Sequence, residues 1–116
     1  ATSDAKITSA YLLPAKHIIH TVGPIWQGGN KGERELLASC YHKCLLLAKE
    51  YGLLTIAFPA ISTGVYHFPA QEAAEIAVRE IRSFLSENTQ IQKVYLVAFD
   101  QRMEDIYMRA LADEEK

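Results

Sequence analysis

Short apolar runs alternate with helical patterns through the middle of this chain. Residues 17–22 (HIIHTV), 53–61 (LLTIAFPAI) and 94–99 (VYLVAF) are apolar, contain many β-branched and aromatic side chains, and lack a clean alternation with polar residues. Such runs are typical of strands that are covered on both faces. Residues 6–13 are predicted to form one more extended segment, which ends near Pro14.

A helical period follows each of the three apolar runs. In residues 33–51, 70–87 and, over a shorter stretch, 102–112, apolar side chains recur at steps of three and four, which places them on one face of a helix. The predicted buried stripe of the first helix contains Leu36, Leu37, Cys40, Tyr41, Cys44, Leu45 and Ala48. The pattern therefore predicts three amphipathic helices.

Residues that favour helix ends flank these helical patterns. Asn30, with Glu33 three positions later, resembles a capping box, and Gly52 is a natural stop. Pro69 suits the start of the second helix, and Asp100 is placed to cap the third. The helix boundaries are therefore predicted from two independent signals.

Three strand-then-helix units predict a single α/β domain over residues 1–116, with a mostly parallel sheet and helices on both faces. In such sheets, ligands bind beyond the carboxyl ends of the strands. The loops at residues 23–32, 62–68 and 100–102 are therefore expected to share one rim, where the candidate site lies.

Composition and charge narrow the classes of function. The net charge is −2 and the isoelectric point is about 6.1, so no overall basic field favours nucleic acid, and we expect no nucleic-acid partner. No apolar run has the length of a membrane span, and we expect no membrane partner. Cys40 and Cys44 lack the companions of a metal or redox site, which favours reduced core thiols and a cytoplasmic location.

The loop ISTGVY, residues 61–66, carries the most informative candidate chemistry. Gly64 permits positive φ and a close ligand approach, consecutive backbone N–H groups of a turn can bind phosphate oxygens, and Ser62 and Thr63 could add hydroxyl donors. An ordinary strand-to-helix connection explains the same residues. Phe99, at the end of a strand, could likewise stack on a nucleobase or simply close the core.

Catalytic and metal-binding patterns do not emerge from the residues alone. His17 and His20 are three apart on a predicted strand and so face opposite sides, which excludes a two-histidine clamp there. His67, beside the candidate loop, is the histidine placed closest to a ligand. We expect no metal site.

Four stretches together resemble the macro domain family, and specifically its branch that removes ADP-ribose or deacetylates O-acetyl-ADP-ribose. They read DAKITSAYLLPAKHIIHTVGPIW, ELLASCYHKCLLLAKEYG, TIAFPAISTGVYHFPAQEAAEIAV and KVYLVAFD. The resemblance covers nearly the whole chain in order, and PAISTGVY before a proline-led helix is its most specific part.

The resemblance implies a three-layer α/β/α macro domain whose cleft binds ADP-ribose as a ligand, with no cofactor. The ADP-ribose-binding residues that it implies are Ser62, Thr63, Gly64, Val65, Tyr66, Phe99 and Asp100. The loop would wrap the diphosphate and distal ribose, Tyr66 would lie over that ribose, and Phe99 would stack on adenine. His67 replaces a glycine that many relatives have, which adds a titratable ring beside the distal ribose.

The resemblance also implies residues that this sequence does not contain. Family members begin with roughly sixty further residues, within the usual size of a domain, which carry the first strands, an Asn-Ala-Ala-Asn-like turn, a second phosphate loop and an aspartate associated with hydrolysis. We therefore expect a truncated domain that lacks the family's first strands, supplies no catalytic residue and is inactive or very weakly active alone. Its incomplete sheet edge is expected to favour homo-oligomers or strand exchange.

The leading functional hypothesis is a nucleotide-binding macro domain whose parent protein hydrolyses O-acetyl-ADP-ribose or mono-ADP-ribosyl esters on proteins. Its partners would be ADP-ribose, or an ADP-ribosylated small molecule or protein. Two alternatives fit the same residues: a non-catalytic reader of ADP-ribose, and an inactive fragment that only self-associates.

Overall fold

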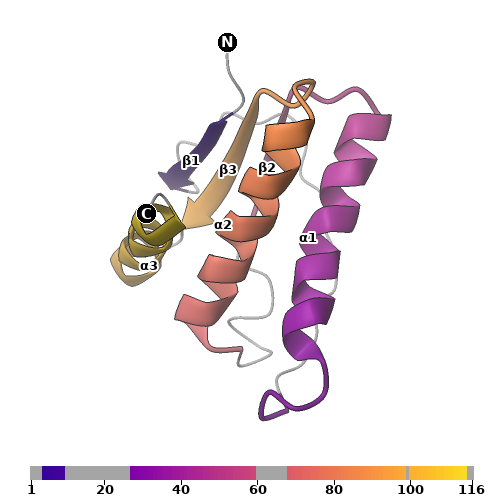
Figure 1. Cartoon of the computed structure of the whole chain (residues 1–116). Coiled ribbons are helices and arrows are strands. Elements are labelled where there is room, and N and C mark those ends of the chain that lie inside the picture. The colour runs from indigo at the N-terminus through magenta and orange to yellow at the C-terminus, as the bar shows by residue number, and fades with distance from the viewer. Residues whose placement is uncertain (1–3, 10–26, 60–67, 99, 115–116) are drawn as a thin grey trace.

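In the part of the chain that the structure describes, three strands and three helices alternate (Figure 1). The structure, a computed structural model, describes residues 4–9, 27–59, 68–98 and 100–114. The elements are β1 (Asp4–Ser9), α1 (Glu33–Glu50), β2 (Thr55–Phe58), α2 (Ala70–Glu87), β3 (Lys93–Ala98) and α3 (Gln101–Glu114). All three predicted helices are confirmed, with ends within two residues of the predicted bounds.

The strands form a parallel sheet in the order β1-β3-β2. Ser9 of β1 lies opposite Ala98 of β3, and Phe58 of β2 lies opposite Leu96 of β3. The parallel sheet and the α/β class predicted from the sequence are therefore confirmed. The extended segment predicted at residues 6–13 is described only to Ser9, and the strand predicted at residues 17–22 lies outside the described residues.

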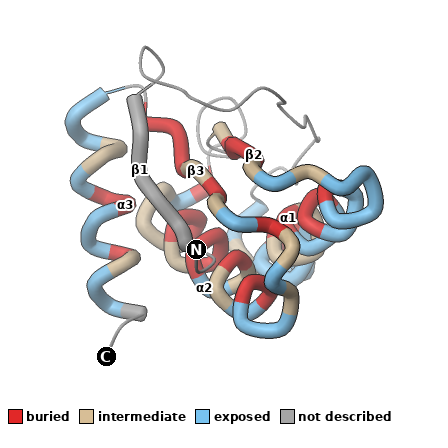
Figure 2. Tube along the Cα trace, turned by 90° about the horizontal axis from the view of Figure 1, so that it is seen from above, coloured by how far each residue is buried: buried red, intermediate tan, exposed pale blue. Residues whose placement is uncertain are grey.

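Among the described residues, one hydrophobic core joins the sheet to the helices, and its buried positions are red in Figure 2. α2 packs against both α1 and α3, and α3 also packs against β3 and β1. Between α1 and β2, the rings of Tyr41 and Phe58 meet edge to face, with centroids 5.0 Å apart. The long buried stripe of α2 forms the middle of this core; it consists of Ala73, Ala74, Ile76, Ala77, Val78, Ile81, Phe84 and Leu85.

The predicted stripe of α1 needs one correction. Leu37, Tyr41, Leu45 and Ala48 are buried as predicted, but Leu36 is 53% exposed. The buried arc of α1 is narrower than the apolar arc of its sequence, and Leu36 lies at its edge. No helix in the described ranges is both long enough and apolar enough to cross a lipid bilayer.

Candidate functional site

The carboxyl ends of the three described strands meet at one edge of the sheet. The strands run parallel, so the segments that follow Ser9, Phe58 and Ala98 all leave from this edge. Segment 60–67 connects β2 to α2 there. The predicted site residues Ser62, Thr63, Gly64, Val65, Tyr66 and Phe99, and also His67, lie outside the described residues, so their roles stay predictions.

Two buried phenylalanines flank segment 60–67 on the described chain. Phe58, at the end of β2, is fully buried, and Phe68, just before α2, is 2% exposed. Pro69 then forms the N-cap of α2, with the Ala73 N–H donating to its carbonyl at 2.9 Å. The hydrophobic core therefore holds both ends of the connection that carries the candidate loop.

Asp100 caps α3, as the sequence predicts. The Met103 N–H donates to Asp100 Oδ1 at 2.8 Å, and the Glu104 N–H donates to the Asp100 carbonyl at 3.1 Å. Asp100 is exposed. Its predicted contact with ADP-ribose stays a prediction, and the structure shows that its carboxylate already has a structural role.

Glu33 forms a site that the sequence did not reveal. Its side chain is 2% exposed, and its carboxylate accepts hydrogen bonds from three backbone N–H groups: Gln27 at 2.7 Å, Gly29 at 2.9 Å and Lys31 at 2.6 Å. Burial raises the pKa of the Glu33 carboxyl, but the backbone hydrogen bonds outweigh it and lower the pKa to about 2. Glu33 is therefore ionised and draws the preceding loop around itself.

The capping box predicted between Asn30 and Glu33 is wrong. The N-cap of α1 is Gly32, which is in the left-handed region with φ of 73°, and no side chain from the described ranges caps the helix. Gly28 and Gly29 also have positive φ, of 91° and 89°. The loop can turn its N–H groups toward one carboxylate because these glycines adopt backbone angles that other residues rarely adopt.

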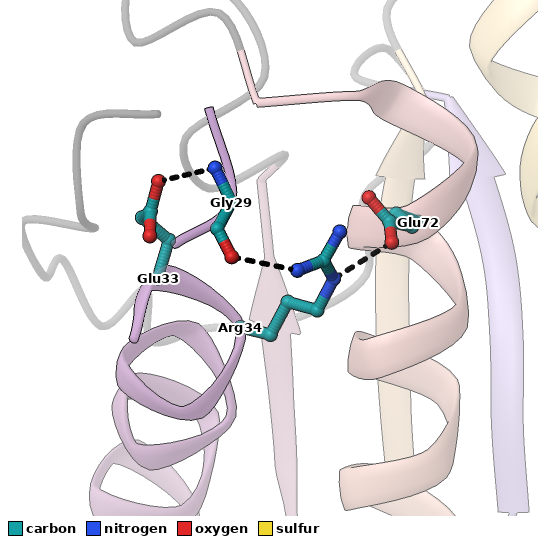
Figure 3. A network of polar contacts seen from close by, with 4 residues as sticks. All are labelled: Gly29, Glu33, Arg34 and Glu72. Carbon is teal, nitrogen blue, oxygen red and sulfur yellow. Dashed lines mark hydrogen bonds and ion pairs between the residues drawn. The ribbon is translucent and has the colours of Figure 1, made fainter. Parts of the chain in front are cut away.

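Arg34 links this loop to the start of α2 (Figure 3). Its Nε donates to Glu72 Oε1 at 2.7 Å, and its Nη1 donates to the Gly29 carbonyl at 3.1 Å. The hydrogen bond with Glu72 raises the pKa of Arg34. Residues 27–32, which belong to the first predicted rim loop, therefore lie beside the first turn of α2.

The third predicted rim loop approaches the same turn from the other side. Pro69 and Arg102 line one cavity between α2 and α3, which has a volume of about 680 Å³. The described parts of the predicted loops at residues 23–32, 62–68 and 100–102 therefore gather around the first turn of α2. This arrangement agrees with the rim that the topology predicts.

The remaining chemical groups show no catalytic arrangement in the described ranges. No group of three or more histidine, cysteine, aspartate or glutamate side chains in these ranges could hold a metal ion. Cys44 is buried and Cys40 partly buried, and no disulfide joins them. His42 is exposed and packs edge-on against Phe84, with ring centroids 5.9 Å apart.

Comparisons with known proteins point to one family. A family model described as Macro domain matches residues 1–77. A macro domain-containing protein of Methanosarcina mazei is 64% identical over 99 residues, which make up 85% of this chain and 53% of that protein. An O-acetyl-ADP-ribose deacetylase of Salmonella newport is 48% identical over 113 residues, or 97% of this chain and 63% of that protein. The chain thus spans 53% to 63% of the length of these two curated relatives.

Solved structures show the same similarity. The Oceanobacillus iheyensis macrodomain with ADP matches with a TM-score of 0.81 and 46% identity, over 93% of this chain and 56% of that one. A mutant of the same macrodomain with ADPR also matches with a TM-score of 0.81, at 47% identity, over 94% of this chain and 59% of that one. These matches confirm the macro-domain-like α/β fold.

Proposed function

Because this chain belongs to the macro domain family, we propose that it binds ADP-ribose at the carboxyl edge of its sheet. Residues 62–66 surround the diphosphate and the distal ribose, and Phe99 stacks on the adenine. The observation that carries this proposal is the family match over residues 1–77, which includes the whole candidate loop. The solved relatives with ADP and with ADPR support the same ligand class.

The described surroundings of the loop favour an anionic ligand at this edge. α2 begins directly after the loop and has no side-chain cap from a described residue, so the first N–H groups of the helix and its positive dipole end face the region where the loop connects. Glu33 and Arg34 hold residues 27–32 beside the same turn. These residues orient the backbone around the ligand rather than react with it.

We further propose that the parent activity is hydrolysis of O-acetyl-ADP-ribose or of mono-ADP-ribosyl esters on proteins. The similarity to the Salmonella newport O-acetyl-ADP-ribose deacetylase supports this branch. Water attacks the ester at the distal ribose, which releases ADP-ribose and the acid. The resemblance assigns residues 62–66 and Phe99 to binding of ADP-ribose, and it assigns no catalytic residue among the four stretches that carry it.

Calorimetric titration with ADP-ribose tests the binding proposal. The 116-residue chain is expected to bind more weakly than the micromolar level, which corresponds to about −8 kcal/mol. Gly64→Glu is expected to abolish binding, because it places bulk and negative charge against the diphosphate. Ser83→Glu adds the same charge at an exposed position of α2 and should leave binding unchanged.

Two results of this titration would contradict the proposal. Binding of ADP-ribose by Gly64→Glu at the wild-type level would refute the placement of the diphosphate. A tight one-to-one complex with the isolated chain would refute the expectation that part of the cleft comes from another segment.

An activity assay tests the hydrolase branch separately. The amino-terminal segment of the Salmonella newport relative is fused ahead of residue 1, and release of acetate from O-acetyl-ADP-ribose is followed by chromatography. Turnover by the fusion, and none by the isolated chain, is the expected result. Tight ADP-ribose binding without turnover would instead identify a reader.

A further inference from the structure

The first turn of α2 carries a carboxylate at the end of the helix that attracts anions. Pro69 is the N-cap, so Glu72 is the third residue of the helix. The Ala73 N–H donates to the Pro69 carbonyl, and the N–H groups of residues 70–72 precede this first bond of the helix. An acidic side chain in the first turn is favourable for a helix, but it competes with any other anion for these N–H groups and for the positive dipole end.

Arg34 engages this carboxylate from the side of α1 (Figure 3). Its Nε donates to Glu72 Oε1 at 2.7 Å, and the two side chains are 45% and 38% exposed. Arg34 Nη1 also donates to the Gly29 carbonyl at 3.1 Å, so the guanidinium is held from two sides. No described side chain, that of Glu72 included, caps α2. The Glu72 carboxylate is therefore neutralised by a cation of another helix and does not occupy the N–H groups of its own helix.

The chain itself keeps the proposed ligand residues close to this turn. Tyr66 precedes Pro69 by three residues, so their Cα atoms are at most about 11 Å apart. Glu72 lies three residues into the helix, which adds a rise of about 4.5 Å along its axis. At about 10 mM salt the Debye length is about 30 Å, so the charges of Arg34 and Glu72 act on an anion bound at residues 62–66.

We propose that Arg34 sets the affinity of the ADP-ribose site for its anionic ligand by neutralising Glu72. This inference rests on the proposed function and adds a residue that determines the strength of binding. With Arg34 in place, the start of α2 stays positive toward the diphosphate. Without Arg34, the Glu72 carboxylate is drawn to the N–H groups of its own helix and repels the diphosphate. Arg34 is thus a positioning residue that acts through Glu72.

A purely structural role of the ion pair predicts a different result. If the pair only held residues 27–32 against α2, its loss from either end would disturb the same contact. Arg34→Gln and Glu72→Gln would then both weaken ADP-ribose binding. Under the proposal the two variants change the affinity in opposite directions, because one leaves an unpaired anion beside the site and the other an unpaired cation.

Nuclear magnetic resonance titration of the 116-residue chain with ADP-ribose at low salt tests this difference, because it measures weak binding and shows that each variant is folded. Arg34→Gln is expected to weaken binding roughly two- to fivefold, the size of a charge effect at a helix end. Glu72→Gln should strengthen binding by a similar factor. The double variant removes both charges and should return to the wild-type affinity.

Matched controls separate this effect from a general change of charge. Lys43→Gln removes an exposed cation from the middle of α1, and Glu87→Gln removes an exposed anion from the far end of α2. Both should bind ADP-ribose as the wild type does. Arg34→Lys keeps the charge and should retain most of the wild-type affinity. Above about 0.15 M salt, where the Debye length is about 8 Å or less, the differences among the variants should shrink.

The outcomes distinguish this inference from the proposed function. Weaker binding by both Arg34→Gln and Glu72→Gln would overturn the inference and leave the ion pair a structural role only. Unchanged affinity in both variants would overturn it as well. If the wild-type chain shows no saturable binding of ADP-ribose at all, the proposed function is refuted, and the inference is refuted with it.

Discussion

Asp100 permits a test that separates a structural role from a ligand-binding role. Its Oδ1 accepts the Met103 N–H at 2.8 Å at the start of α3. Replacing a capping aspartate with alanine costs about 1 kcal/mol, within a range of about 0.5–2. Asparagine keeps the cap and loses only the interaction of the charge with the helix dipole, which is about 0.5 kcal/mol at an exposed position. The free energy of unfolding should therefore fall in the order wild type, Asp100→Asn, Asp100→Ala.

Urea denaturation measures this order, and thermal unfolding should show a shift of about 4 °C per kcal/mol for a domain of this size. Asp113→Ala is the control, because it removes an exposed carboxylate from the other end of α3, where the dipole does not favour it.

ADP-ribose affinity then separates the two roles. If the Asp100 carboxylate contacts the ligand, both variants lose ADP-ribose affinity equally. If the carboxylate only positions α3, Asp100→Asn keeps the wild-type affinity for ADP-ribose. Equal stability of wild type and Asp100→Ala would refute the cap.

Three further predictions follow from the core, the buried carboxylate and the candidate cleft. Leu45→Ala should lower the free energy of unfolding by about 2–5 kcal/mol because Leu45 is fully buried. Leu46→Ala is the control, because Leu46 is 45% exposed, and it should change the free energy of unfolding by less than about 0.5 kcal/mol. The pKa of Glu33 falls from 4.5 to about 2 on folding, so its stabilising effect is complete above pH 4.5 and is lost as the pH falls toward 2. Glu33→Gln should remove this part of the pH dependence of the free energy of unfolding in urea titrations. An unchanged pH profile in this variant would contradict the stabilising role of the Glu33 carboxylate. In a protein with the complete cleft, Phe99→Ala should weaken ADP-ribose binding by about 1–3 kcal/mol in calorimetry, and unchanged affinity would exclude adenine stacking on this ring.

The candidate site was predictable only in part. The ISTGVY loop and its family resemblance were visible in the sequence, because the loop residues are contiguous and their order is specific. The three hydrogen bonds to Glu33 were not, since an acidic residue three positions after Asn30 predicts a capping box equally well. A clue was present in the glycines at positions 28 and 29, whose positive φ lets the backbone turn toward a carboxylate.

Local pattern alone determined the three helices, their ends and the Asp100 cap. Helical periodicity and capping depend on residues within a few positions of each other, so a single stretch of sequence contains the whole signal. Tertiary structure decided the strand order β1-β3-β2, the exposure of Leu36 and the burial of the Gln71 amide atoms. Each of these depends on which distant segments pack together, and the free energy of that packing belongs to the whole core rather than to any one segment.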